Sequence, residues 1–193
     1  MIGNDIVDIE LAKRNSRWQE QRYLDKLFTT EEQEFIRSGD QQFQNIWRLW
    51  TMKESVYKIT SRAEGTIRFN PTNFKCTVLD ATQGKIIYKN QSIATSTIIN
   101  QNFVQTTASS NPQWVSKIFQ FSSLDYPTQH SESVQQAIKA YAAYKKVVDT
   151  SVAVIKNRTG IPQFYIYGQL QTEQLSLTHH GLYGAFAISV IES

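Results

Sequence analysis

Apolar and polar residues along this chain follow two periods, one typical of strands and one typical of helices. Residues 2–11 (IGNDIVDIEL) are rich in β-branched side chains and predict a short strand. Thr29, followed three residues later by Glu32, predicts a helix that begins with a capping box. Residues 40–59 predict a longer helix that ends near Gly65, and the pattern changes again after Phe69.

After Phe69 the chain consists of short strand-like runs separated by polar turns. The polar segment 109–114 is the best boundary, and it divides the chain into parts of residues 1–111 and 112–193. The second part predicts a strand at 114–121, a helix at 131–148 capped by Ser131 or Ser133, and further strands. Both parts run from a strand through helical sequence into a set of strands. This α+β pattern is the one that a duplicated fold would produce.

The helix predicted for residues 40–59 carries two charges on its apolar side. At roughly 100° per residue, Lys53 and Glu54 fall inside an arc of large apolar side chains, namely Phe43, Ile46, Trp47, Leu49, Trp50 and Tyr57. Outside the arc lie Arg48, Thr51, Met52 and Ser55. Burying a charge is costly unless it is paired or binds a metal. Two interpretations stay open: the charges satisfy each other or reach solvent, or they bind a cation or a phosphate.

The first strand carries a similar anomaly. With a period of two, Asp5 shares a face with Gly3, Val7 and Ile9. One interpretation is that Asp5 caps a neighbouring backbone group. The other is that Asp5 meets a carboxylate on the helix and that both bind a hard cation such as Mg²⁺, which commonly uses one or two carboxylates plus substrate phosphates.

Two adjacent histidines close the run LSLTHH at residues 175–180. His179 alternates onto the face of Leu175 and Leu177, whereas His180 shares the other face with Ser176 and Thr178. A lone histidine on an apolar strand is more often a satisfied core residue than a ligand. The pair, followed by Gly181, also fits a site at the strand end, although no third residue completes a zinc signature.

The composition of the chain excludes several classes of protein. The apolar fraction is 40%, the charged fraction is 19% and the formal net charge is +3, which indicates a globular chain without a nucleic-acid partner. Cys76 is the single cysteine, which excludes an internal disulfide and a cysteine zinc cluster. We find neither a membrane-length apolar run nor a secretory signal, so we expect a cytoplasmic protein without a membrane partner.

Basic residues are concentrated in the segment after the first strand: Lys13, Arg14, Arg17, Arg22 and Lys26. They form either a solvated face or a docking surface for an acidic partner.

Taken together, these segments resemble the motifs of the 4'-phosphopantetheinyl transferase superfamily. GNDIVDIE is similar to its first motif, and WTMKESVYK is similar to its second, in which a lysine follows the glutamate by four positions. LSLTHHGLYGAFAIS resembles the serine-x-serine-histidine strand and the strand after it. FTTEEQEF and TGIPQF resemble two further family segments, the latter a Gly-Lys-Pro turn.

The resemblance implies transfer of the 4'-phosphopantetheine arm of coenzyme A to a serine of an apo carrier protein, with release of 3',5'-ADP. Asp5 and Glu54 would hold Mg²⁺, with Mn²⁺ as the alternative, against the pyrophosphate. Lys53 and Lys58 would contact phosphate, and Lys58 would also assist the leaving group. His179 would contact a phosphate of coenzyme A, and Glu54 is the candidate base for the serine proton. Because such carrier proteins are acidic, a docking surface is expected at Lys13, Arg14 and Arg17.

The resemblance also has departures. Ile161 stands where the turn usually has a lysine, and Arg158 is the candidate replacement. The segment after Lys58 lacks the expected glycines. The position two residues after Asp5 is Val7 and not a carboxylate, which resembles the short holo-carrier-protein synthase branch of the family. The length of the chain resembles the two-lobed branch instead. The resemblance implies two pseudo-symmetric lobes, each with helices on a small antiparallel sheet, in a monomer with its site between the lobes.

Two alternatives to an active transferase remain: a family member that only binds coenzyme A or a carrier, and a structural α+β protein with coincidental motifs. The carrier could serve fatty-acid, polyketide or peptide synthesis.

Overall fold

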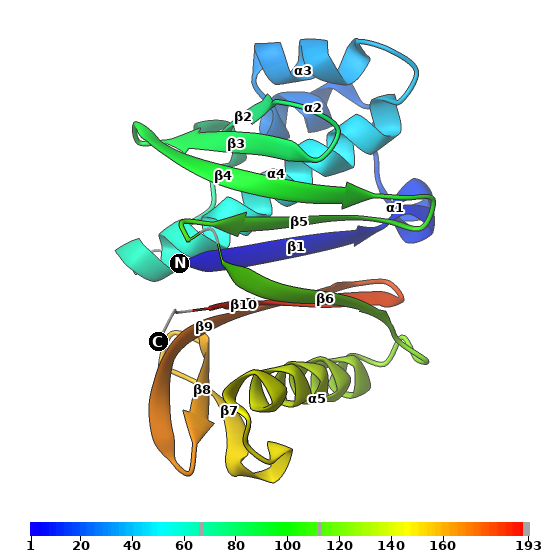
Figure 1. The fold of residues 1–193 in the computed structure, drawn as a ribbon. Coiled ribbons are helices and arrows are strands. Elements are labelled where there is room, and N and C mark those ends of the chain that lie inside the picture. The colour runs from blue at the N-terminus through cyan, green and yellow to red at the C-terminus, as the bar shows by residue number, and fades with distance from the viewer. Residues whose placement is uncertain (66–67, 112, 191–193) are drawn as a thin grey trace.

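The computed structural model describes residues 1–65, 68–111 and 113–190, which form two five-stranded antiparallel sheets with helices packed on them (Figure 1). The first sheet has the order β1-β5-β4-β3-β2, with β1 (Ile2–Asp8), β2 (Lys75–Val78), β3 (Gln83–Tyr88), β4 (Gln91–Ile99) and β5 (Phe103–Ser109). The second has the order β6-β10-β9-β8-β7, with β6 (Trp114–Gln120), β7 (Val152–Lys156), β8 (Pro162–Ile166), β9 (Gln169–His180) and β10 (Tyr183–Ser189).

The two sheets correspond strand for strand. In each, the first strand lies at one edge beside the last, and the strands between them form a meander. A long helix precedes each meander: α4 (Gln42–Glu64) in the first lobe and α5 (Tyr126–Lys145) in the second. In the described part of the first lobe there are also three shorter helices, α1 (Ile9–Asn15), α2 (Gln21–Leu27) and α3 (Thr30–Arg37). A 3₁₀ turn is described in each lobe, η1 (Pro71–Asn73) and η2 (Asp149–Ser151). The predicted fold class, α+β with two pseudo-symmetric lobes, is confirmed.

Local signals in the sequence set several element boundaries. The capping box of Thr29 and Glu32 is present at the start of α3, and Gly65 ends α4 in the left-handed conformation with φ 66°. The first strand is shorter than predicted, because the Asp8 side chain accepts a hydrogen bond from Leu11 N and so begins α1. None of the described helices is long and apolar enough to span a membrane.

Helix α4 is buried on two sides, which corrects the single apolar arc predicted from its sequence. Thr51, Met52 and Ser55 lie outside that arc, yet all three are fully buried. The Thr51 and Ser55 hydroxyls meet Thr106 of β5 at 2.8 and 2.9 Å. Because these small polar side chains find partners, they can pack against the sheet as closely as apolar ones. Two residues of the predicted arc, Trp50 and Tyr57, pack against Phe69, and Tyr57 also meets Phe74.

Helix α5 begins earlier than the sequence suggested. Its cap is Asp125, whose carboxylate accepts a hydrogen bond from Thr128 N, and Pro127 lies in its first turn. The predicted caps, Ser131 and Ser133, are inside the helix. A proline is tolerated in the first turn because the N–H that it lacks would have no partner there. The extra turn carries Tyr126 and His130, which line the site described below.

The lobes meet where β1 runs along β9 (Figure 1). Side chains of β9 take the place of a neighbouring backbone: Asn4 N donates to Ser176 Oγ at 3.1 Å, and Asp8 N donates to His180 Nδ1 at 3.0 Å. Edge N–H groups of β1 are therefore satisfied by the face of β9 that the sequence marked as polar. This contact sets Asp5 of the first lobe beside Thr178 of the second.

Candidate functional site

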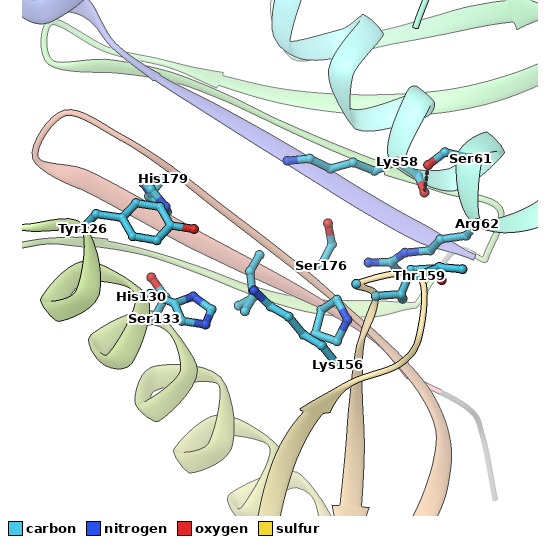
Figure 2. Close-up of a pocket in the computed structure, with 14 residues that line it drawn as sticks. Lys58, Ser61, Arg62, Tyr126, His130, Ser133, Lys156, Thr159, Ser176 and His179 are labelled. Atoms are coloured by element: carbon cyan, nitrogen blue, oxygen red, sulfur yellow. Dashed lines mark hydrogen bonds between the residues drawn. The ribbon is translucent and has the colours of Figure 1, made fainter. Parts of the chain in front are cut away.

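A cavity of about 290 Å³ lies between the two lobes. Its walls come from α4, α5, the β7–β8 hairpin and β9 (Figure 2). Three lining side chains are lysine or arginine, namely Lys58, Arg62 and Lys156, and none of the described lining residues is an aspartate or glutamate. A pocket with this lining is suited to an anionic ligand.

Lys58 connects the cavity to Asp5. Its ammonium donates to the Asn4 carbonyl oxygen at 2.7 Å and lies 3.3 Å from Asp5 Oδ1. The same Asp5 oxygen accepts a hydrogen bond from Thr178 Oγ1 at 2.9 Å. Among the described residues Asp5 caps no neighbouring backbone group; it joins a helix of one lobe to a strand of the other. The cavity lining includes Lys58 but not Asp5, which contacts the Lys58 ammonium.

Glu54 stands one turn before Lys58 on α4 and is also close enough to Asp5 to feel its charge. The pKa of Glu54 is raised to about 7, first by burial and then by repulsion from Asp5, against the attraction of Lys58. Among the described residues no hydrogen bond reaches the Glu54 carboxylate. The cluster of Asp5, Glu54 and Lys58 thus has two acidic groups and one basic group, so a further positive charge would be favourable there.

The Asp5 and Glu54 pair fits a divalent cation. Mg²⁺ typically takes one or two carboxylates and completes its shell with water and phosphate oxygens. Burial is the larger cause of the raised Glu54 pKa, and the smaller part, the repulsion from Asp5, would be relieved by a cation between the two groups. The described residues hold no group of three or more metal-ligating side chains, so the protein could supply only part of the shell.

The two histidines have different surroundings. His179 lines the cavity, where Tyr126 packs edge-on against it at 5.3 Å between ring centroids. Burial, followed by the positive charges of His130, Lys58 and His180, lowers the pKa of His179 and so favours the neutral ring. His180 instead accepts a hydrogen bond from Asp8 N and helps to join β9 to β1.

Lys53 points away from this cavity, although it neighbours Glu54 in the chain. Its side chain is fully buried and pairs with Glu32 at 2.8 Å, and it also donates to the Pro71 and Phe74 carbonyls at 2.9 and 2.7 Å. Its donors are thus occupied inside the first lobe, which corrects the predicted phosphate contact. The interpretation that Lys53 and Glu54 satisfy each other is also wrong, since the partner of Lys53 is Glu32.

The remaining candidates lie at the surface. Lys13 and Arg14 are exposed on α1, and Arg17 follows it. Arg14 pairs with Glu10 at 2.8 Å, and Arg17 lies 3.8 Å from Glu20, so nearby acids dilute the positive charge. Arg158 is exposed in the β7–β8 turn and is not among the residues that line the cavity.

Sequence patterns did not reveal three basic residues of the cavity: Arg62, His130 and Lys156. Arg62 donates to the Ile2 carbonyl at 3.1 Å and to the Leu175 carbonyl at 2.5 Å, so it joins the lobes, and burial lowers its pKa to about 10. Its place one turn after Lys58 on the same helix is the one signal that could have indicated it. His130 lies just before the helix that the sequence predicts at 131–148, and Lys156 ends one of the further strands that it predicts.

Comparisons with known proteins agree with the motifs. A family model described as the 4'-phosphopantetheinyl transferase superfamily matches residues 1–114. No curated protein gives a significant match. Among solved structures, the chain is similar to Helicobacter pylori holo-[acyl-carrier-protein] synthase in complex with coenzyme A, with 11% identity over 99% of this chain and 100% of that chain. The TM-score of 0.29 makes this likeness too weak to place any residue.

Proposed function

This chain belongs to the 4'-phosphopantetheinyl transferase superfamily, and we propose that it transfers the 4'-phosphopantetheine arm of coenzyme A to a serine of an apo carrier protein. In this reaction the serine Oγ forms a bond to the β-phosphorus of coenzyme A. The bond between that phosphorus and the bridging oxygen breaks, and 3',5'-ADP leaves. The serine proton passes to a base.

The observation that supports the proposal is the juxtaposition of Asp5, Glu54 and Lys58 beside a cationic cavity. A pyrophosphate requires positive charge around it, which Lys58 and Arg62 offer from successive turns of α4. The Lys58 ammonium has three donors, of which the Asn4 carbonyl and Asp5 take two. The remaining donor is available to the cavity and suits the charge that develops on the departing nucleotide.

Glu54 is the proposed base. A base is most effective when its pKa is near the working pH, and in the metal-free protein burial with the Asp5 charge places the pKa of Glu54 at about 7. Its carboxylate accepts no hydrogen bond from the described residues, so it is not committed to a structural contact. It can therefore take the serine proton as the new phosphoester bond forms.

Asp5 and Glu54 are also the residues proposed to hold Mg²⁺, with Mn²⁺ as the alternative. When bound, the cation would neutralise pyrophosphate charge and polarise the phosphoryl oxygens. Thr178 would keep Asp5 oriented, because its hydroxyl donates to Asp5 Oδ1 at 2.9 Å.

The proposed partner is an apo acyl or peptidyl carrier protein. We propose that Lys13, Arg14 and Arg17 attract its acidic surface. The two lobes enclose a site within one chain, which supports a monomer. The proposed location of the reaction is the cytoplasm. Fatty-acid, polyketide and peptide carriers are all compatible with this surface.

One departure supports a second candidate, a protein that binds coenzyme A or a carrier without catalysis. Ile161 lines the cavity at the position where the resemblance implies a lysine.

A transfer assay distinguishes the two functions. The protein is incubated with coenzyme A, Mg²⁺ and an apo carrier of each class, and intact-mass spectrometry follows the addition of phosphopantetheine. Transfer by the parent, with loss in Glu54→Gln, supports the enzyme. Coenzyme A binding without transfer to any carrier supports the binding protein.

A further inference from the structure

A second cavity, of about 560 Å³, lies at the start of α4, and we call it the first-lobe cavity. Its volume is in the range of small-molecule sites. It is built from the first turns of α4, the β2–β3 turn, the end of β4 and the β4–β5 turn. None of the described residues of the second lobe lines it. A ligand there would therefore bind the first lobe alone.

The match between the two lobes gives this cavity a counterpart. The start of α5, the β7–β8 hairpin and β9 form the second-lobe wall of the cavity described above. By position in the sheets, α4 corresponds to α5, the β2–β3 hairpin to the β7–β8 hairpin, and β4 to β9. The same three elements thus surround a hollow in each lobe, but with different side chains.

Arg48 is the one charged side chain among the described residues that line the first-lobe cavity. It is only 6% exposed. Its Nη2 donates to the Asp80 and Gln83 carbonyl oxygens at 2.6 and 3.1 Å, which holds the β2–β3 turn against α4. Among the described residues Nε and Nη1 have no hydrogen-bond partner, so three of the five N–H donors of this guanidinium lack a protein acceptor.

The positive charge of Arg48 is also incompletely balanced. Burial lowers the pKa of Arg48, and the charge of Asp80 opposes this effect only in part. The Asp80 carboxylate is engaged in its own turn, where it accepts hydrogen bonds from Thr82 N and Gln83 N, both at 2.7 Å. A buried charge with unmatched donors favours an anionic ligand.

The other lining groups indicate which anion fits. They are neutral, and most of them are side-chain amides or hydroxyls that can both donate and accept hydrogen bonds: Gln41, Gln44, Asn45, Thr82, Thr97, Asn100 and Gln101. One guanidinium balances one carboxylate, whereas a phosphate monoester carries close to two negative charges near pH 7. The neutral lining suits hydroxyl or amide groups on the rest of the ligand.

We propose that the first-lobe cavity binds a small organic acid, whose single carboxylate contacts the Arg48 guanidinium and whose hydroxyl or amide groups contact the neutral lining. This site is separate from the proposed transferase site. The described linings of the two cavities share no residue.

An NMR titration of the isotope-labelled protein tests the site with three probes: N-acetylglycine, its neutral analogue N-acetylglycinamide, and inorganic phosphate. For N-acetylglycine we expect saturable shifts of the Arg48 Nε–H and of the Gln44 and Asn45 side-chain amides, with a Kd of about 1–10 mM for so small a ligand. The neutral analogue should bind about 10-fold more weakly, because it loses a hydrogen bond between charged groups. Phosphate should also bind more weakly than the acid.

Variants connect the shifts to Arg48. Arg48→Met should abolish the Gln44 and Asn45 shifts, whereas Arg48→Lys should keep part of the affinity, because it retains the charge without the planar fork. Arg48→Met also removes the bonds to the β2–β3 turn. Replacing Gln44 and Asn45 together by Ala leaves those bonds intact and should weaken binding about 5-fold. Arg22→Met, at an exposed arginine of α2 outside the cavity, should match the parent.

Four results would overturn the proposal. They are the absence of saturation below about 100 mM acid, equal binding of the acid and its neutral analogue, tighter binding of phosphate than of the acid, and unchanged affinity in Arg48→Met and in the double variant. The titration contains neither coenzyme A nor a carrier. Its outcome is therefore independent of the proposed transferase.

Discussion

Gly3 of β1 lies directly against the Ser55 carbonyl of α4, so that a methyl group on Gly3 would fall 2.0 Å from that oxygen. The missing side chain lets the helix lie close to the strand. Ser55 lies about one turn before Lys58 on α4, and the Lys58 ammonium donates a hydrogen bond to the carbonyl oxygen of Asn4, the residue after Gly3. The glycine of the first motif is thus required for helix–strand packing next to the proposed active site.

Gly3→Ala should therefore destabilise the protein and abolish transfer. We expect the free energy of unfolding in urea to fall by about 3 kcal/mol, the upper part of the range for overpacking. Gly168→Ala is the control: nothing lies within 4 Å of its added carbon, and its φ of 78° costs an alanine about 1 kcal/mol. Full transfer by Gly3→Ala would show that the close approach does not position the site.

Replacing Lys53 should mainly reduce stability, whereas replacing Lys58 should mainly reduce the transfer rate. Lys53→Met leaves Glu32 buried without its ion pair, so we expect a loss of about 3–5 kcal/mol in unfolding free energy. Adding Glu32→Gln should recover part of this loss, because the amide can keep the cap without a charge. Lys58→Met, whose lysine is 27% exposed, should lose only about 1 kcal/mol but most of the transfer rate. The reverse pattern, with Lys53→Met stable and inactive, would return Lys53 to the active site.

Glu54 should make stability depend on pH in a direction unusual for a carboxyl group. Its folded pKa of about 7 exceeds the ordinary 4.5, so between these values the folded state binds more protons than the unfolded state. The unfolding free energy should fall as pH rises through this window, by up to about 3 kcal/mol. Glu54→Gln should remove the fall and be more stable than the parent at pH 8 in the absence of metal. Parallel curves for parent and variant, measured by urea unfolding, would contradict the raised pKa.

Divalent cations should stabilise the folded protein through Asp5 and Glu54. We expect Mg²⁺ to raise the Tm of the parent at pH 8, because a ligand of the folded state stabilises it by mass action. Asp5→Asn and Glu54→Gln should lose most of this response. Asp40→Asn, at an exposed acid before α4, should keep it. An equal rise in all four proteins would indicate nonspecific binding.

The basic surface should affect the carrier and leave coenzyme A unaffected. Replacing Arg14 and Arg17 together by Glu should raise the carrier KM by about 10-fold at low salt, since both side chains are exposed and act through screened charge. Coenzyme A affinity should stay within about twofold of the parent value, because neither arginine lines the cavity. A variant with Lys117→Glu and Lys139→Glu makes the same change of net charge at two exposed lysines elsewhere and is the control. Equal carrier KM values for the double variant and the parent would exclude this docking surface.

The sequence alone predicted the features that depend on near neighbours in the chain. The α+β class, the capping box of Thr29 and Glu32 and the end of α4 at Gly65 were confirmed. The predicted polar face of residues 175–180 has a structural role, because the Ser176 and His180 side chains accept hydrogen bonds from backbone N–H groups of β1. Each of these depends on period or on hydrogen bonds within a few residues.

Tertiary structure decided which charges meet. Lys53 and Glu54 are adjacent in the chain, but successive residues of a helix point about 100° apart. One therefore reaches Glu32 inside the first lobe, and the other reaches the surroundings of Asp5. Lys156 likewise enters the cavity because of where the second lobe sets its hairpin. Which side chains meet across more than 20 residues of sequence depends on how whole helices and strands pack, and a local sequence pattern does not determine that packing.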